Sequence, residues 1–176
     1  MTTGVAIQNP FTLFYAAQTM DWNEYIGHQF WNKNFTSDPG ITNATSLKTI
    51  YSPSPSRYVE PKSAAFTGFT STGGNTSTAS QYNVSGSYNH GWNFYTDGWK
   101  TGGTIFFVAL GYRDTYKNTS GTGNLFSVRN ECYYWTNSSA LNPDFGGRSF
   151  GANAALIYPQ AAGITSYAFP IRPVKE

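Results

Sequence analysis

Short apolar segments alternate with polar, glycine-rich stretches along the whole chain, and most of the apolar segments have the length of a β-strand. The most continuous one, residues 104–110, predicts a central buried strand that ends at Gly111. In residues 166–174 the side chains alternate, which predicts a closing strand with Tyr167, Phe169 and Ile171 on one side. Further strands are expected at residues 48–51, 57–59, 81–88, 125–128 and 133–135.

Turn and helix signals separate these segments. Pro61 suits the first turn of a short helix, and Gly68 suits its end. Asp97-Gly98 lies between apolar runs and indicates a hairpin turn. Polar residues 137–147 are expected to form a loop, and residues 148–157 a hairpin. The pattern therefore predicts an α+β fold class, with short irregular antiparallel strands and one or two short helices.

Composition supports one folded, strand-rich domain. The chain has 176 residues, which is a usual length for a single domain. Charged residues make up 11% and aromatic residues 18%, so the low charge is accompanied by enough rings for a packed core. Tyrosine, serine, glycine and asparagine are plentiful, as they are in binding loops. We expect residues 1–176 to form one domain, with residues 1–40 as a lead-in.

Charge and motifs argue against several functions. The net charge is +2 with no basic run, so no nucleic-acid partner is expected. No apolar stretch approaches a membrane span, and no signal peptide is visible. His28 and His90 lie far apart, and the carboxylates are scattered, so we predict no enzyme, no metal and no cofactor. Cys132 is the single cysteine and is expected to be a small buried apolar residue.

The last third of the chain, residues 111–176, carries a recognisable order of motifs. It has Gly111-Tyr112-Arg113-Asp114, then the aromatic strand Tyr133-Tyr134-Trp135-Thr136, then the closing segment 166–176. This order resembles the C-terminal half of the Fibrobacter succinogenes major paralogous domain, above all the variable proteins of diversity-generating retroelements in gut Bacteroidetes, such as Bacteroides, and their phages. The resemblance implies a C-type-lectin-like fold and a receptor-binding protein or adhesin, on a phage tail or a bacterial cell surface.

The same resemblance implies which residues bind the ligand. In such proteins, side chains that vary lie on one exposed face, held by strands that do not vary. Residues of this chain between the matching motifs are the corresponding positions: Ser149, Gly151, Leu156, Tyr158, Ala161, Ala162, Gly163 and Ile164. Weaker candidates are Phe126, Asn130, Glu131, Asn142, Asp144 and Phe145.

Other interpretations stay open at this level. A glycan-binding adhesin of fixed specificity, or a structural pilus or tail module, fits the same composition, and self-association is possible. Asn142-Pro143-Asp144 weakly resembles a calcium-binding turn of lectins, but few other carboxylates lie nearby, and a polar turn explains it equally well. Arg113 and Arg172 are expected to form scaffold ion pairs, with Asp114 or Glu60 as partners.

Overall fold

The computed structural model describes most of the chain outside the first thirty residues. The described residues are 8, 31–35, 37–88, 90–113, 124–142, 145–164 and 167–176. No helix among them is long and apolar enough to span a membrane.

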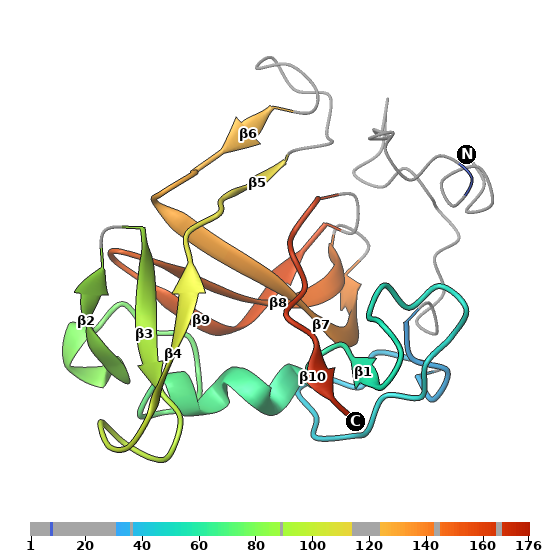
Figure 1. Cartoon of the computed structure of the whole chain (residues 1–176), viewed down its shortest axis with the longest axis horizontal. Helices are drawn as coiled ribbons and strands as arrows, with labels where there is room; N and C mark the ends of the chain where they lie inside the picture. Colours follow the sequence, from blue (N-terminus) through green and yellow to red (C-terminus); the bar gives the residue numbers. More distant parts are fainter. Residues whose placement is uncertain are drawn as a thin grey trace.

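Antiparallel pairs and triplets of strands make up the described structure (Figure 1). One three-stranded sheet contains β7 (Glu131–Asn142), β8 (Phe145–Asn153) and β9 (Ile157–Gly163). The other contains β2 (Val84–Tyr88), β3 (Gly91–Tyr95) and β4 (Thr104–Val108). Two-stranded ladders join β1 (Tyr58–Val59) to β10 (Val174–Lys175), and β5 (Tyr112–Arg113) to β6 (Leu125–Phe126). The 3₁₀ helices are η1 (Ser63–Phe69) and η2 (Ala79–Gln81).

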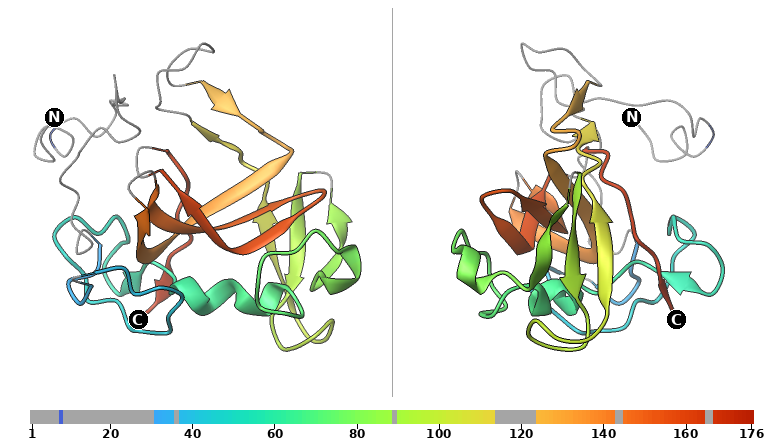
Figure 2. Two further views of the ribbon diagram at one scale, coloured as in Figure 1. Left: turned by 180° about the vertical axis from the view of Figure 1, so that it is seen from behind. Right: turned by 60° about the vertical axis from the view of Figure 1, so that its left-hand side comes forward.

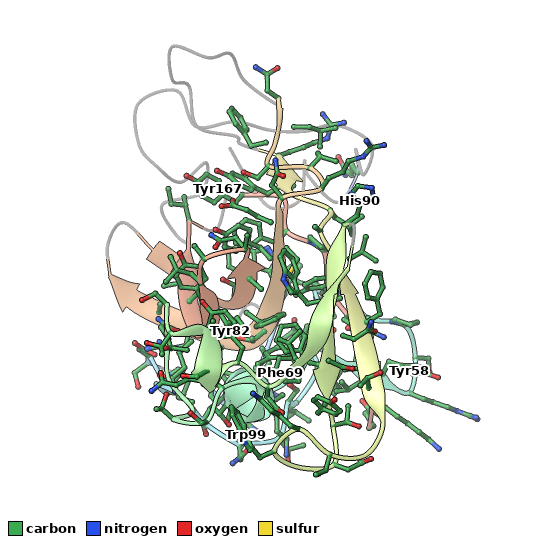
Figure 3. All side chains as sticks on the ribbon, turned by 90° about the vertical axis from the view of Figure 1, so that its left-hand side faces the viewer. Tyr58, Phe69, Tyr82, His90, Trp99 and Tyr167 are labelled. Carbon is green, nitrogen blue, oxygen red and sulfur yellow. The ribbon has the colours of Figure 1, made fainter. Side chains whose placement is uncertain are left out.

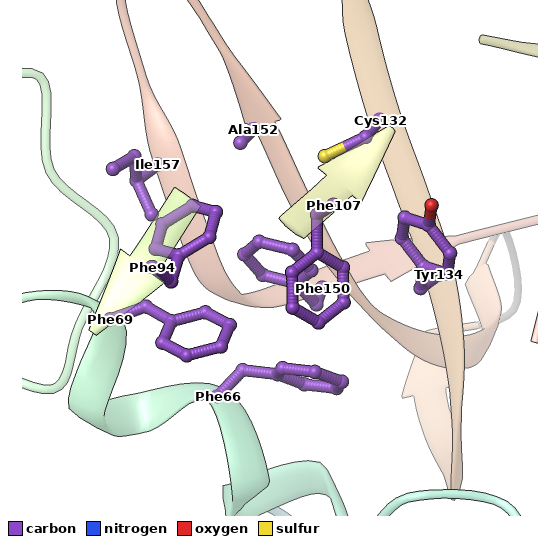
Figure 4. Packing of buried hydrophobic residues seen from close by; sticks show 9 residues of the cluster. All are labelled: Phe66, Phe69, Phe94, Phe107, Cys132, Tyr134, Phe150, Ala152 and Ile157. Carbon is purple, nitrogen blue, oxygen red and sulfur yellow. The ribbon is translucent and has the colours of Figure 1, made fainter. Parts of the chain in front are cut away.

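Phenylalanine rings from distant segments meet in the core between these elements (Figure 4). Phe150 of β8 is fully buried and lies 4.8 Å from the ring of Phe66 and 5.1 Å from that of Phe107. Phe69 stacks on Phe94 of β3 at 4.2 Å. The cluster therefore joins the β7–β8–β9 sheet, the β3–β4 hairpin and η1 into one body, with η1 running along the lower edge of both sheets (Figure 2).

The expected α+β class is wrong. Strand makes up 41% of the structure and helix about 9%, so the fold is mostly β. The helix signal after Pro61 does produce a helix, but it has 3₁₀ geometry and seven residues. A segment this short gains too few hydrogen bonds to offset the cost of starting an α-helix, and it is held instead by packing Phe66 and Phe69. The structure thus does not support the α+β, C-type-lectin-like architecture that the resemblance implied.

Four expected elements also differ from the structure. Residues 48–51 form no strand, and Ile50 is 88% exposed. The strand at 104–110 ends at Val108 and lies at the side of its sheet, not at the centre. Residues 137–147 belong largely to the long β7–β8 hairpin, and residues 167–173 make isolated bridges at Ala168 and Ile171 in place of a continuous strand.

Other predictions are confirmed. The hairpin within residues 148–157 is the β8–β9 connection, and the strand at 57–59 is β1. Asp97-Gly98 lies in the β3–β4 hairpin, where the Asp97 carboxylate accepts a bond from the Gly103 backbone N–H at 2.7 Å. Cys132 is fully buried in β7.

Among the described residues, Glu60 forms no ion pair with Arg113 or Arg172. Asp114 lies outside the described residues, and the Glu60 carboxylate accepts bonds from Ser52 and Ser54. The ion pair that is present joins Arg148 of β8 to Asp38, with 3.0 Å between Nη2 and Oδ2. It fastens the loop around Asp38 to the sheet.

Truncating the Phe150 side chain should strongly destabilise the protein. We expect Phe150→Ala to lower the free energy of unfolding by about 3–5 kcal/mol, because the cavity cannot be refilled by rings fixed on other strands. Urea unfolding followed by circular dichroism measures this. Ile50→Ala at an exposed position is the control and should change stability by less than about 0.5 kcal/mol. Similar losses for both variants would contradict this core.

Because Cys132 is buried, the free energy of unfolding depends on pH in the alkaline range. Desolvation raises the pKa of its thiol to about 12, from an ordinary value of 9.0. The folded state therefore keeps the proton that the unfolded state releases. This contribution to stability is full below pH 9 and is lost as the pH rises toward 12. Wild-type protein should lose more stability over that range than Cys132→Ala, measured by urea unfolding at each pH; parallel curves would refute the assignment.

Candidate functional site

The β7–β8–β9 sheet has two different faces. Along β7, Cys132 and Tyr134 point into the phenylalanine core (Figure 4). The alternate residues Tyr133 and Trp135 therefore lie on the opposite side, here called the outer face. Because directly paired residues of an antiparallel ladder share a face, the register extends this face across all three strands. It contains the rows Tyr133–Gly151–Tyr158 and Trp135–Ser149–Ala161.

Aromatic rings from five separate segments gather on the outer face. Tyr133 stacks on Phe169 of the C-terminal segment at 4.9 Å, and Trp135 lies 4.5 Å from the same ring. Tyr112 of β5 contacts Tyr133, Phe169, Tyr167 and Phe126 at 5.3–5.8 Å. We call the set the aromatic face: Tyr112, Phe126, Tyr133, Trp135, Tyr158, Tyr167 and Phe169.

Most of these rings remain accessible to solvent. Trp135 is buried, whereas the other six residues are half-buried. Half-exposed tyrosines present a flat apolar ring together with a hydroxyl that can donate or accept a hydrogen bond. Tyr167 lies at the opposite end of the molecule from Phe69 and Trp99 (Figure 3). The aromatic face is thus an accessible surface distinct from the main core.

Three glycines, Gly147, Gly151 and Gly163, lie beneath these rings, and we call them the glycine floor. A Cβ added at Gly151 would lie 2.7 Å from the Tyr133 ring, and one at Gly147 would lie 2.7 Å from Trp135. A Cβ at Gly163 would lie 2.8 Å from Phe169 and 2.9 Å from Trp135. Real Cβ atoms do not approach so closely, so each ring rests on a strand at a position where no side chain fits.

The eight residues expected to bind ligand differ both in the face of the sheet on which they lie and in their burial. Five of them share the outer face by register or pairing: Ser149, Gly151, Tyr158, Ala161 and Gly163. However, Ser149, Gly151, Gly163 and Ile164 are buried, so they do not present side chains to a partner. Leu156, in the β8–β9 turn, is half-buried, as are Tyr158 and Ala161, and Ala162 is exposed. Ala162 pairs with Arg148, which places it on the other side of the sheet.

The weaker candidates are scattered. Phe126 belongs to the aromatic face, stacked on Tyr112 at 5.8 Å. Glu131 begins β7 and accepts a hydrogen bond from the Asn153 amide at 3.3 Å, and Asn130 is exposed just before it. Asn142 and Phe145 pair at the end of the β7–β8 hairpin. Their side chains, and Asp144, lie outside the described residues, and so does the turn compared with calcium-binding lectins.

Sequence reasoning missed five rings of the aromatic face as binding residues: Tyr112, Tyr133, Trp135, Tyr167 and Phe169. Two signals were available. Tyr133 alternates with Cys132 and Tyr134, and the alternation at Tyr167 and Phe169 did place both on one side, where they contact Tyr112. Alternation alone does not say which side is the core, because both faces of β7 carry aromatic residues.

The electrostatics of the face are those of neutral hydroxyls. Burial raises the pKa of Tyr133 well above its usual range, and the nearby Glu131 and Tyr158 raise it further. The phenol therefore stays protonated and acts as a hydrogen-bonding group, not as a base. Within the part of the chain that the structure describes, no three His, Cys, Asp or Glu side chains come together in a way that would hold a metal ion.

Comparison with known proteins gives no match: no family model matches the chain, and neither a curated protein nor a solved structure is significantly similar to it.

A methyl group at Gly151 should disturb the aromatic face. We expect Gly151→Ala to lower the free energy of unfolding by about 1–3 kcal/mol, because the Tyr133 ring is packed on Phe169 and cannot move away freely. Gly68→Ala is the matched control, since a Cβ there meets nothing within 4 Å. Thermal unfolding of both variants measures the difference. Equal stability of the two would show that the ring does not rest on Gly151.

Proposed function

We propose that this protein is a binding protein that recognises a partner molecule through the aromatic face. One observation carries the proposal: half-exposed rings from β5, β6, β7 and the C-terminal segment are packed against one another on one side of a sheet, and Tyr158 of β9 lies in the same row of that face as Tyr133. Tyrosine and tryptophan are enriched among residues that contribute most to binding energy. A surface of this composition is what such recognition uses.

The packing of the rings supports tight recognition. Side chains that are free before binding lose conformational freedom when a partner immobilises them, at about 0.5–1.5 kcal/mol each. Tyr133 is already held between Phe169 and Tyr112, and Tyr112 contacts Tyr167. These rings are therefore largely ordered in the free protein, and little of the binding energy is spent on ordering them.

The proposed partner is a protein or glycan receptor on a bacterial surface, with this protein on a phage tail or on a cell surface. The support for that setting is the order of motifs in residues 111–176 that resembles retroelement variable proteins. The neutral, hydroxyl-bearing rings are compatible with either partner chemistry, because both present apolar patches next to hydrogen-bonding groups.

Diversification of the surface is the finer part of the proposal, and packing restricts where it can occur. Gly151 and Gly163 leave no space for a side chain. Leu156, Tyr158, Ala161 and Ala162 are half-buried or exposed, so substitutions there should change stability little. We therefore propose that variation concentrates at these four positions, of which Ala162 lies on the other side of the sheet from Tyr158 and Ala161.

Removing rings from the face should abolish binding without unfolding the protein. Wild-type protein is screened for binding to intact bacterial cells and to a glycan array, and Tyr158→Ala and Tyr167→Ala are then compared with it. We expect the variant that combines Tyr158→Ala with Tyr167→Ala to bind at least about 30-fold more weakly, which corresponds to a loss of about 2 kcal/mol of binding free energy. Tyr58→Ala, at an exposed tyrosine of β1, is the control and should bind normally. Unchanged binding of the double variant would refute the assignment of the face.

Sequencing the coding locus in related isolates tests diversification separately. The expected result is that differences cluster at the codons for Leu156, Tyr158, Ala161 and Ala162, with a template repeat and a reverse transcriptase gene nearby. Equal variability along the whole chain would refute diversification by a retroelement. The remaining proposal would then be a binding protein of fixed specificity.

A further inference from the structure

A pocket of about 720 Å³ lies away from the aromatic face, between η1, the β3–β4 hairpin and the C-terminal segment. Its walls include the rings of Phe66, Phe69 and Phe107, which belong to the core cluster. Tyr95 and Trp99 also line it, and Trp99 is 42% exposed. The volume falls in the range of about 300–1,000 Å³ that is typical of small-molecule sites.

One guanidinium supplies the charge of this pocket. Arg172 lies over the face of Phe107, with 4.8 Å from Cζ to the ring centroid, and its Nη1 donates to the Phe106 carbonyl. It is the single charged side chain among the lining residues, and no described carboxylate pairs with it. A guanidinium carries five N–H donors, so it retains capacity for an anionic oxygen.

Three of the other polar side chains of the lining are already bonded within the protein, which leaves the hydroxyls of Ser71 and Tyr95 and the indole N–H of Trp99. The Thr70 hydroxyl donates to the Gly74 carbonyl at 2.9 Å. The Thr96 hydroxyl donates to the Gly103 carbonyl at 3.1 Å. Asn83 is buried and uses both ends of its amide. A sugar needs many free hydrogen-bonding groups around it, and these side chains do not offer them.

Asn83 also fixes the distance between the pocket walls. Its Nδ2 donates to the Gly68 carbonyl of η1 at 2.8 Å and to the Gly98 carbonyl at 3.0 Å, and its Oδ1 accepts from the Lys100 backbone N–H at 2.7 Å. One buried side chain thereby joins η1 to the turn that carries Trp99. The pocket is formed before a ligand enters, which reduces the cost of binding.

From these observations we propose that the pocket binds a small carboxylate with an aromatic body. The ring of the ligand packs against Phe69 and Trp99, and its carboxylate is bound by Arg172. Charge complementarity selects the anion, and the scarcity of free polar groups selects the apolar body. This site shares no lining residue with the aromatic face, so it is independent of the proposed function.

The test compares two ligands that differ in charge alone. 4-Phenylbutyrate and the neutral 4-phenylbutyramide are titrated into the full chain in a calorimeter. We expect the carboxylate to bind at least about tenfold more tightly, as for a hydrogen-bonded charge pair. Arg172→Gln should remove this preference while leaving binding of the amide unchanged.

Two further variants keep the result interpretable. Trp99→Ala changes an exposed ring of the hairpin, so the fold should persist, and both ligands should bind several-fold more weakly. Tyr158→Ala on the aromatic face should change neither affinity. Equal affinities for the two ligands, no binding of either at millimolar concentration, or unchanged binding by Trp99→Ala would each overturn the proposal, whatever the outcome for the aromatic face.

Discussion

The stacking of phenylalanine rings around Phe150 is the interaction on which the rest of the structure depends. The described strands fall into separate sheets that share no strand, so the ladders of backbone hydrogen bonds within each sheet do not join one sheet to another. Phe150 connects β8 to Phe66 and Phe69 of η1, to Phe94 of β3 and to Phe107 of β4. Aromatic contacts add to the burial of large apolar surfaces, so one cluster can orient three otherwise separate elements.

That cluster determines where both proposed sites lie. With Phe150 and Tyr134 directed inward, Tyr133 and Trp135 must face the other way, which creates the outer face. On its far side, Phe107 is at once a core residue and a wall of the pocket, and it carries the Arg172 guanidinium on its ring. The two surfaces thus depend on the same core but share no lining residues, so a substitution in one need not change the other.

Some of this arrangement could be predicted from the sequence. The β8–β9 hairpin, β1 and buried Cys132 follow from local pattern and residue type. The β7–β8 hairpin could not, because residues 137–139 are polar and fit a loop. Asn137 and Ser138 are buried in a strand because hydrogen bonds satisfy their polar groups: the Asn137 amide donates to the Ser46 hydroxyl at 2.8 Å, and its backbone N–H donates to the Pro61 carbonyl. The family resemblance, not local pattern, named Tyr158 and Phe126, and neither indicated the glycine positions beneath the rings, which depend on which ring crosses which strand.

The glycine floor changes how binding and stability are divided in this protein. A sheet with one buried and one exposed face would confine stability to the first and recognition to the second. Here the exposed side contains positions where stability is set as well, because Gly151 and Gly163 support the rings that a partner would contact. Positions that set stability and positions open to a partner therefore both lie on the outer face: the backbone covered by the rings belongs to the first group, and the exposed edges of the rings belong to the second. Selection for a new partner can act on Tyr158 and its exposed neighbours, whereas a side chain at Gly151 would displace the contact surface itself.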